Sequence, residues 1–200
     1  MILPPVARVF FAIDISDNMK TRLGDYIDSL KKISKSKSIR WSKPENLHVT
    51  LQFLAEVKGE HIEDMIKNVK AELMAAMPPF QIMLRSIHLY PDPHRPRVLG
   101  VDVVPTATLT RLSELTGIGI KKTGYEIEVR PFRAHMTIGR IKTAQVSALN
   151  FLADAPPPDV GRIDVTEVVL FMSEPHPDGS HYVPLQRIPL ASSGVVKERA

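Results

Sequence analysis

Cysteine is absent from this chain of 200 residues. Its absence excludes disulfide frameworks, thiolate metal sites and cysteine nucleophiles. Long hydrophobic runs are also missing, because no stretch approaches the roughly 18 to 20 apolar residues that span a bilayer. The opening run MILPPVARVFFAIDIS is interrupted by two prolines and Arg8, and it lacks a charged leader and a small-residue cleavage site. We therefore predict that it forms a strand, and that the protein is cytoplasmic and has no membrane partner.

Glycine-rich phosphate-binding motifs are missing as well. The sequence has no P-loop and no G-x-G-x-x-G, which argues against nucleoside triphosphates and dinucleotides as cofactors. It also has no G-x-S-x-G elbow, so serine-type nucleophilic catalysis is not indicated. We expect no cofactor.

The composition that remains is that of an ordinary globular protein, with 44% hydrophobic and 24% charged residues. No visible linker divides the chain, so we expect one domain over 1–190 and a flexible tail over 191–200. The net charge of +4 permits anionic partners. Six cations and no acid lie between Lys31 and Lys43. This run would suit a phosphate backbone, but the basic end of a helix followed by a solvated loop explains it equally well.

The order of elements repeats along the chain. Hydrophobic periodicity predicts helices at 17–34, 60–77, 106–122 and about 143–153, and strands at 7–14, 47–57, 80–90, 97–104, 126–130, 134–141, 162–172 and 181–190. A shift of 87 residues carries His48 onto His135, Thr50 onto Thr137 and the strand at 80–88 onto 167–175. We infer an internal duplication, with halves at about 7–90 and 96–190, which predicts a pair of lobes with a site between them.

The strongest candidates for chemistry are the motifs H-V-T-L at 48–51 and H-M-T-I at 135–138. Because residues i and i+2 of a strand share a face, His48 lies beside Thr50, and His135 beside Thr137. For either motif alone, a structural histidine bonded to its neighbour is the better interpretation. Two such triplets arise by chance in about 5% of comparable chains. As a matched pair they favour an acid–base site.

This spacing does not favour a metal site. Zinc sites built on histidine need three or four protein ligands, and no carboxylate accompanies either motif on its face in the sequence. We therefore expect no metal. Two histidines can divide the work of displacement at phosphorus, one as base toward water and one as acid toward the leaving alkoxide. The hydroxyls of Thr50 and Thr137 could hold the nonbridging oxygens.

Several strings resemble one family through nearly the whole chain: RVFFAIDI, IRWSKPENLHVTLQFLAEV, PRVLGVDV, RPFRAHMTIGRIK and VVLFMSE…HYVPLQRIPL. They are similar to the RNA 2′,3′-cyclic phosphodiesterases, also called 2′-5′ RNA ligases, of the two-histidine phosphoesterase superfamily. The resemblance implies an α+β fold that is bilobal, with pseudo-twofold duplicated antiparallel sheets and outer helices around a central cleft. It also implies metal-free hydrolysis of an RNA-terminal 2′,3′-cyclic phosphate to a 2′-phosphate, with reversible 2′-5′ ligation as a second reaction.

The resemblance assigns His48 as proton donor and His135 as proton acceptor, with Thr50, Thr137 and Arg140 at the phosphate. Strict strand alternation argues against Arg140, since 135, 137 and 139 share a face and 140 does not. A bulge at Gly139 would resolve this, because glycine in a strand often marks one. Arg133 has the right parity and is the reserve candidate.

The chain departs from the family pattern at three positions. The family commonly has proline at the position of Ala134, glycine at Ala55 and tryptophan at Gly100. None of these touches the acid, the base or the threonines. The missing tryptophan removes an aromatic that could have packed or stacked in the site.

Two other functions stay open at this point. One is a phosphodiesterase that acts on a smaller cyclic phosphate, such as ADP-ribose 1″,2″-cyclic phosphate. The other is a noncatalytic module that binds RNA or nucleotides. The expected partner is RNA or a nucleotide with a 2′,3′-cyclic phosphate end. We expect a monomer with no obligate protein partner, because one chain contains both halves of the site.

Overall fold

The computed structural model describes residues 3–34, 37–142, 146–153, 155–177 and 179–191. Apart from residue 191, the tail predicted at 191–200 lies outside this part of the chain. In chain order the elements are β1 (Val6–Asp14), α1 (Asp17–Ser34), β2 (Ile39–Trp41), η1 (Pro44–Asn46), β3 (His48–Lys58), η2 (Gly59–His61), α2 (Ile62–Ala76), β4 (Phe80–Tyr90), β5 (Val98–Val104), α3 (Thr106–Lys121), β6 (His135–Ile141), η3 (Val146–Ala153), β7 (Arg162–Val165), β8 (Glu167–His176) and β9 (Gly179–Pro189).

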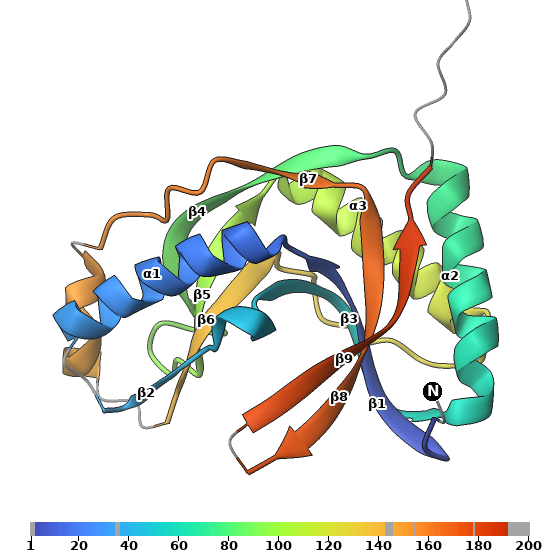
Figure 1. Cartoon of the computed structure of the whole chain (residues 1–200), viewed down its shortest axis with the longest axis horizontal. Helices are drawn as coiled ribbons and strands as arrows, with labels where there is room; N and C mark the ends of the chain where they lie inside the picture. Colours follow the sequence, from blue (N-terminus) through green and yellow to red (C-terminus); the bar gives the residue numbers. More distant parts are fainter. Residues whose placement is uncertain (1–2, 35–36, 143–145, 154, 178, 192–200) are drawn as a thin grey trace, which may run out of the picture.

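The strands form one curled antiparallel sheet in the order β7-β4-β5-β6-β3-β1-β8-β9, and β2 pairs with β6 (Figure 1). The two halves of this order correspond under the 87-residue shift, which relates β3 to β6 and β4 to β8. The repeats exchange strands. β4 of the first repeat pairs with β5 of the second, and β8 of the second repeat pairs with β1 of the first. Each half of the sheet therefore contains strands from both repeats.

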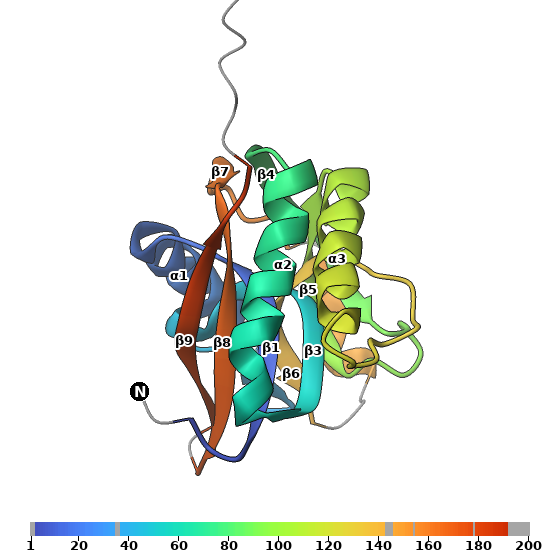
Figure 2. The same cartoon turned by 90° about the vertical axis from the view of Figure 1, so that its right-hand side faces the viewer.

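The core lies on the side of the sheet that the helices cover. Val49 and Leu51 of β3, and Met136 and Ile138 of β6, are buried there, as the alternation of the two motifs predicts. Helices α2 and α3 pack side by side outside the sheet (Figure 2). Helix α1 buries Leu23, Ile27 and Leu30 in the same core, and its outer side chains bond to the segment 156–160. The predicted α+β class with antiparallel sheets and outer helices is confirmed.

Three element predictions need correction. The segment 126–130 is not a strand, and the side chain of Val129 is 98% exposed. The segment cannot pair with β6, because β5 already pairs with one edge of β6, and β3 and β2 pair with the other edge. The helix predicted at 143–153 is a 3₁₀ helix over its described part, and the strand predicted at 162–172 is divided at Thr166 into β7 and β8.

None of the helices in the described ranges is both long enough and apolar enough to cross a bilayer.

Candidate active site

The two H-x-T motifs lie side by side at the centre of the sheet. Val49 of β3 pairs with Met136 of β6, and each is the second residue of its motif. Because the strands are antiparallel, each histidine lies across from the threonine of the other motif. With Val49 and Met136 turned into the core, both imidazoles and both hydroxyls project from the opposite face.

These four side chains line a single pocket of about 660 Å³. Five cations and one acid also line it, so the pocket suits an anionic ligand. The cations are Arg8, Arg40, Lys43, Arg130 and Arg140, and the acid is Glu128. Phe10, Trp41, Phe53 and Tyr182 add aromatic surface to the same walls.

His48 is held on both of its ring nitrogens. Its Nδ1 lies 2.7 Å from the carbonyl oxygen of Asn46, which can only accept, so Nδ1 carries the proton. Its Nε2 lies 3.0 Å from the Thr50 hydroxyl. The rings of Phe10 and Tyr182 enclose the imidazole, with centroids 4.8 and 5.2 Å away. Burial lowers the pKa of His48 to about 4, so the ring is neutral in the free protein at neutral pH.

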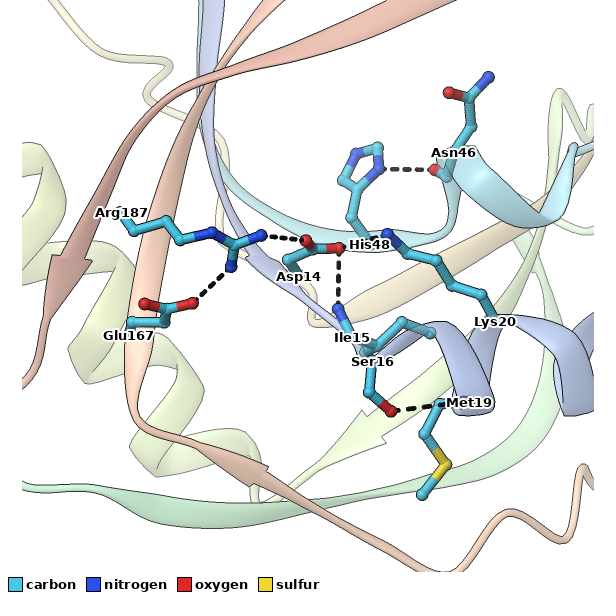
Figure 3. Close-up of polar contacts among 9 residues, drawn as sticks. All are labelled: Asp14, Ile15, Ser16, Met19, Lys20, Asn46, His48, Glu167 and Arg187. Atoms are coloured by element: carbon cyan, nitrogen blue, oxygen red, sulfur yellow. Dashed lines mark hydrogen bonds and ion pairs between the residues drawn. The ribbon is translucent and has the colours of Figure 1, made fainter.

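Asp14 lies directly opposite His48 on the neighbouring strand β1. Its carboxylate pairs with Lys20 at 2.8 Å and with Arg187 at 3.3 Å, and it accepts the backbone N–H of Ile15 at 2.9 Å (Figure 3). Arg187 also pairs with Glu167. The charge of Asp14 favours the imidazolium form of His48, but this effect on the pKa is smaller than that of burial.

His135 repeats part of this arrangement. Its Nδ1 lies 2.8 Å from the carbonyl oxygen of Arg133. Arg133 precedes His135 by two residues, just as Asn46 precedes His48. The Nε2 atom therefore carries the lone pair of the neutral ring. Asp102 lies opposite His135 on β5, as Asp14 lies opposite His48 on β1. Neither motif contains a carboxylate in its own sequence, but a neighbouring strand places one opposite each histidine.

Each motif strand has a bulge directly after its threonine. The register of β3 against β1 shifts between Thr50 and Gln52, and that of β6 against β5 shifts between Thr137 and Gly139. Each shift moves the residue five positions after the histidine to the pocket face. That residue is Phe53 in β3 and Arg140 in β6, and both line the pocket.

The bulge that Arg140 requires is therefore present. The reserve candidate Arg133 is not among the described residues that line the pocket. It contributes its carbonyl to His135, and its guanidinium lies 3.5 Å from the carbonyl of Pro91.

The basic run from Lys31 to Lys43 serves two purposes. Lys31 pairs with Asp28 at the exposed end of α1, as the structural interpretation predicts. Arg40 lies opposite Arg140 in the pairing of β2 with β6, and both residues line the pocket with Lys43.

Sequence reasoning misses the aromatic surroundings of His48, because it identifies Phe10 and Tyr182 only as strand residues. Phe10 and Asp14 are four residues apart in β1, so their side chains lie on the same face of the strand. This spacing is the sequence signal that could have placed Phe10 near His48. No sequence signal places Tyr182 near His48, because β9 reaches β1 only through β8.

Within the described residues, no group of three or more histidine, aspartate or glutamate side chains is arranged to hold a metal ion.

Comparison with known proteins agrees with this geometry. The family described as LigT-like phosphoesterase matches residues 13–100. An RNA 2′,3′-cyclic phosphodiesterase of Archaeoglobus fulgidus is 30% identical over 182 residues, which are 90% of this chain and 98% of the relative. The chain belongs to this phosphoesterase family.

Solved structures of LigT-like phosphoesterases share the fold. The crystal structure of E. coli LigT complexed with 3′-AMP has a TM-score of 0.74 and 25% identity, and covers 92% of this chain and 98% of LigT. A protein of Thermus thermophilus has a TM-score of 0.75 at 24% identity, with 93% and 99% coverage. The predicted membership of the family is confirmed.

Proposed function

We propose that this LigT-like phosphoesterase hydrolyses RNA-terminal 2′,3′-cyclic phosphate to a 2′-phosphate, without a metal ion. The observation that carries the proposal is the pairing of Val49 with Met136, which brings both H-x-T motifs to one cationic pocket. In support, the relative from Archaeoglobus fulgidus bears the name of this activity, and E. coli LigT has been crystallised with 3′-AMP.

His135 acts as the base in this proposal. Its Nδ1–H donates to the Arg133 carbonyl, so the lone pair on Nε2 is free to accept a proton from water. The water oxygen bonds to phosphorus while its proton passes to Nε2. The P–O3′ bond then breaks, and its electron pair stays on O3′.

His48 acts as the acid that protonates O3′. Because its pKa is lowered to about 4, the free protein at neutral pH has no proton on Nε2. The proton must therefore be taken up with the substrate, whose negative charge favours the imidazolium form. An imidazolium with a lowered pKa is a strong acid and suits protonation of an alkoxide.

The phosphate oxygens are held by Thr50, Thr137 and Arg140. The two hydroxyls flank the histidines on the pocket face, and the bulge after Thr137 turns Arg140 toward the same space. A guanidinium can bind two phosphate oxygens at once and stabilise the charge that develops on them.

The test is turnover of an RNA oligonucleotide that ends in a 2′,3′-cyclic phosphate, in the presence of EDTA. We expect the wild type to form only the 2′-phosphate, and His48→Ala and His135→Ala each to lower kcat by about 100-fold to 10,000-fold. Thermal melts of both variants check that they are folded. A 3′-phosphate product, or activity that EDTA abolishes, would contradict the mechanism.

The same assay with ADP-ribose 1″,2″-cyclic phosphate and with 2′,3′-cyclic AMP separates the alternative substrates. Faster turnover of ADP-ribose 1″,2″-cyclic phosphate than of the oligonucleotide would favour the smaller substrate. Binding of RNA without turnover of any cyclic phosphate, unchanged by His48→Ala, would favour a noncatalytic module.

We also propose that a ribose 5′-hydroxyl in the position of the attacking water allows 2′-5′ ligation, the reverse of cleavage. Incubation of RNA that ends in a 2′,3′-cyclic phosphate with a second RNA that begins with a 5′-hydroxyl tests this. We also propose that the protein is active as a monomer, because both H-x-T motifs that form the pocket belong to one chain.

A further inference from the structure

The ring of Tyr90 stacks on the ring of His135. The two centroids are 4.5 Å apart and the planes differ by 22°. The bond from Nδ1 to the Arg133 carbonyl fixes one edge of the imidazole, but rotation about this edge would still swing Nε2. A parallel ring against the imidazole face restricts that rotation.

Tyr90 is itself held by two further side chains. Its hydroxyl donates to Oδ1 of Asp102, and Oδ2 of Asp102 lies 2.6 Å from Nδ1 of His88. Burial and the hydrogen bond to Asp102 raise the pKa of Tyr90, so the phenol stays protonated and continues to donate. His88, Tyr90 and Asp102 thus form a chain that leads across β4 and β5 to His135 on β6.

Gly100 leaves the space that the stack requires. A Cβ atom at this position would lie 2.9 Å from Cε2 of Tyr90 and 3.1 Å from Cδ2 of His135. Any larger side chain must displace one of the two rings. The ring of Tyr90 thus lies directly against Gly100, next to His135.

The two histidines differ in how many rings restrain them. In the described part of the chain, His48 has ring contacts with Phe10, Phe171 and Tyr182, whereas His135 has one, with Tyr90. Tyr90 does not line the pocket with His135. We therefore expect its contribution to pass through the imidazole, and comparison of KM with kcat distinguishes this from contact with bound substrate.

We propose that Tyr90 is a positioning residue for His135, and that Asp102 and His88 hold its ring in place. The inference rests on the proposed role of His135 as the base. The stack fixes the direction of Nε2 toward the attacking water, so loss of the stack lowers kcat and leaves KM almost unchanged. A small misplacement of a reacting group can cost about 100-fold in rate.

A double-mutant cycle tests this on the full chain with the cyclic-phosphate oligonucleotide. We expect Tyr90→Leu to lower kcat by about 10-fold to 100-fold with KM within about two-fold. Tyr90→Phe keeps the ring but loses the bond to Asp102, so it should lower kcat less than Tyr90→Leu does, whereas Gly100→Ala should lower kcat by displacing the stack. In a His135→Ala background, Tyr90→Leu should change the residual rate by less than about two-fold, because the group it positions is gone.

Tyr125→Leu is the matched control. Tyr125 also contacts a histidine, with its hydroxyl 2.9 Å from Nδ1 of His61, but it lies outside the pocket. This variant should lose stability and keep kcat. The inference is overturned if Tyr90→Leu leaves kcat unchanged, raises only KM, or lowers the rate equally in the His135→Ala background.

A second readout separates this inference from the proposed function. The ring current of Tyr90 should shift the NMR signal of the His135 Cδ2 proton, and Tyr90→Leu should move that signal while the His48 signal stays in place. If the wild type turns over no cyclic phosphate, the proposed function fails and the NMR experiment still decides the stack. An unmoved His135 signal overturns the inference whatever the turnover.

Discussion

At the scale of single residues, His48 couples stability to pH. Its pKa is about 4 in the folded protein and about 6.5 in an unfolded chain, so the unfolded state binds the proton first as the pH falls. Above about pH 6.5, protonation of His48 does not affect the free energy of unfolding. As the pH falls to about 4, this free energy decreases by about 3 kcal/mol, because the unfolded chain binds the proton more tightly. Urea unfolding of the wild type and of His48→Gln at several pH values measures this. A pH dependence equally steep in both proteins would contradict it.

Arg140 and Arg133 form a matched pair of test positions. Arg140 lines the pocket through the bulge after Thr137, whereas the Arg133 guanidinium points toward the Pro91 carbonyl. We expect Arg140→Gln to lower kcat/KM by about 10-fold to 100-fold, since a charge-assisted phosphate contact is lost. Arg133→Gln should change kcat/KM by less than about three-fold. The opposite ranking in steady-state assays would restore Arg133 as the phosphate ligand.

At the scale of elements, Asp14 ties α1 and β9 to β1. Its side chain is only 14% exposed, as is typical of a group that needs its partners, whereas Arg187 is 54% exposed. Asp14→Ala leaves the largely buried ammonium of Lys20 without this partner and should destabilise the fold by about 1 to 3 kcal/mol. Arg187→Gln should cost less than about 1 kcal/mol, because exposed ion pairs are weak. Urea unfolding compares the two variants, and an equal loss would show that Arg187 is the main anchor.

The sequence predicts elements well where side chains repeat with one period. The pairs His48 and Thr50, and His135 and Thr137, share a face because both strands alternate regularly up to the threonine. Beyond it, alternation fails at both bulges, and only Gly139 gives a local signal for one of them. The segment 126–130 has a strand pattern without a free partner edge, which is a property of the sheet and not of the segment.

At the scale of the whole molecule, the sequence predicts a duplication but does not predict how the strands of the two halves pair. Equal offsets place equivalent elements in each repeat. They do not say that β4 and β8 cross to the other half of the sheet. For the same reason Asp102 and Tyr90, which are distant from His135 in the sequence, could not be assigned to its surroundings.

The exchange predicts how fragments of the chain behave. A fragment that ends after residue 92 would carry β4 without β5 and β7, its two partners in the sheet. The remaining fragment would carry β8 without β1. We expect each fragment alone to lack cooperative unfolding by circular dichroism, and a mixture of the two to recover both structure and turnover. Independent folding of either fragment would contradict this.

The pairing of Val49 with Met136 has one more consequence. If the two repeats were identical, a rotation about this pair would interchange the histidines, and the protein could not distinguish one end of a substrate from the other. Because both predicted repeats belong to one polypeptide, the surroundings of the two histidines can differ, with three aromatic rings about His48, and Tyr90 with Asp102 about His135. Linkage of the two halves in one chain would thus allow a symmetric framework to give the proposed reaction a direction.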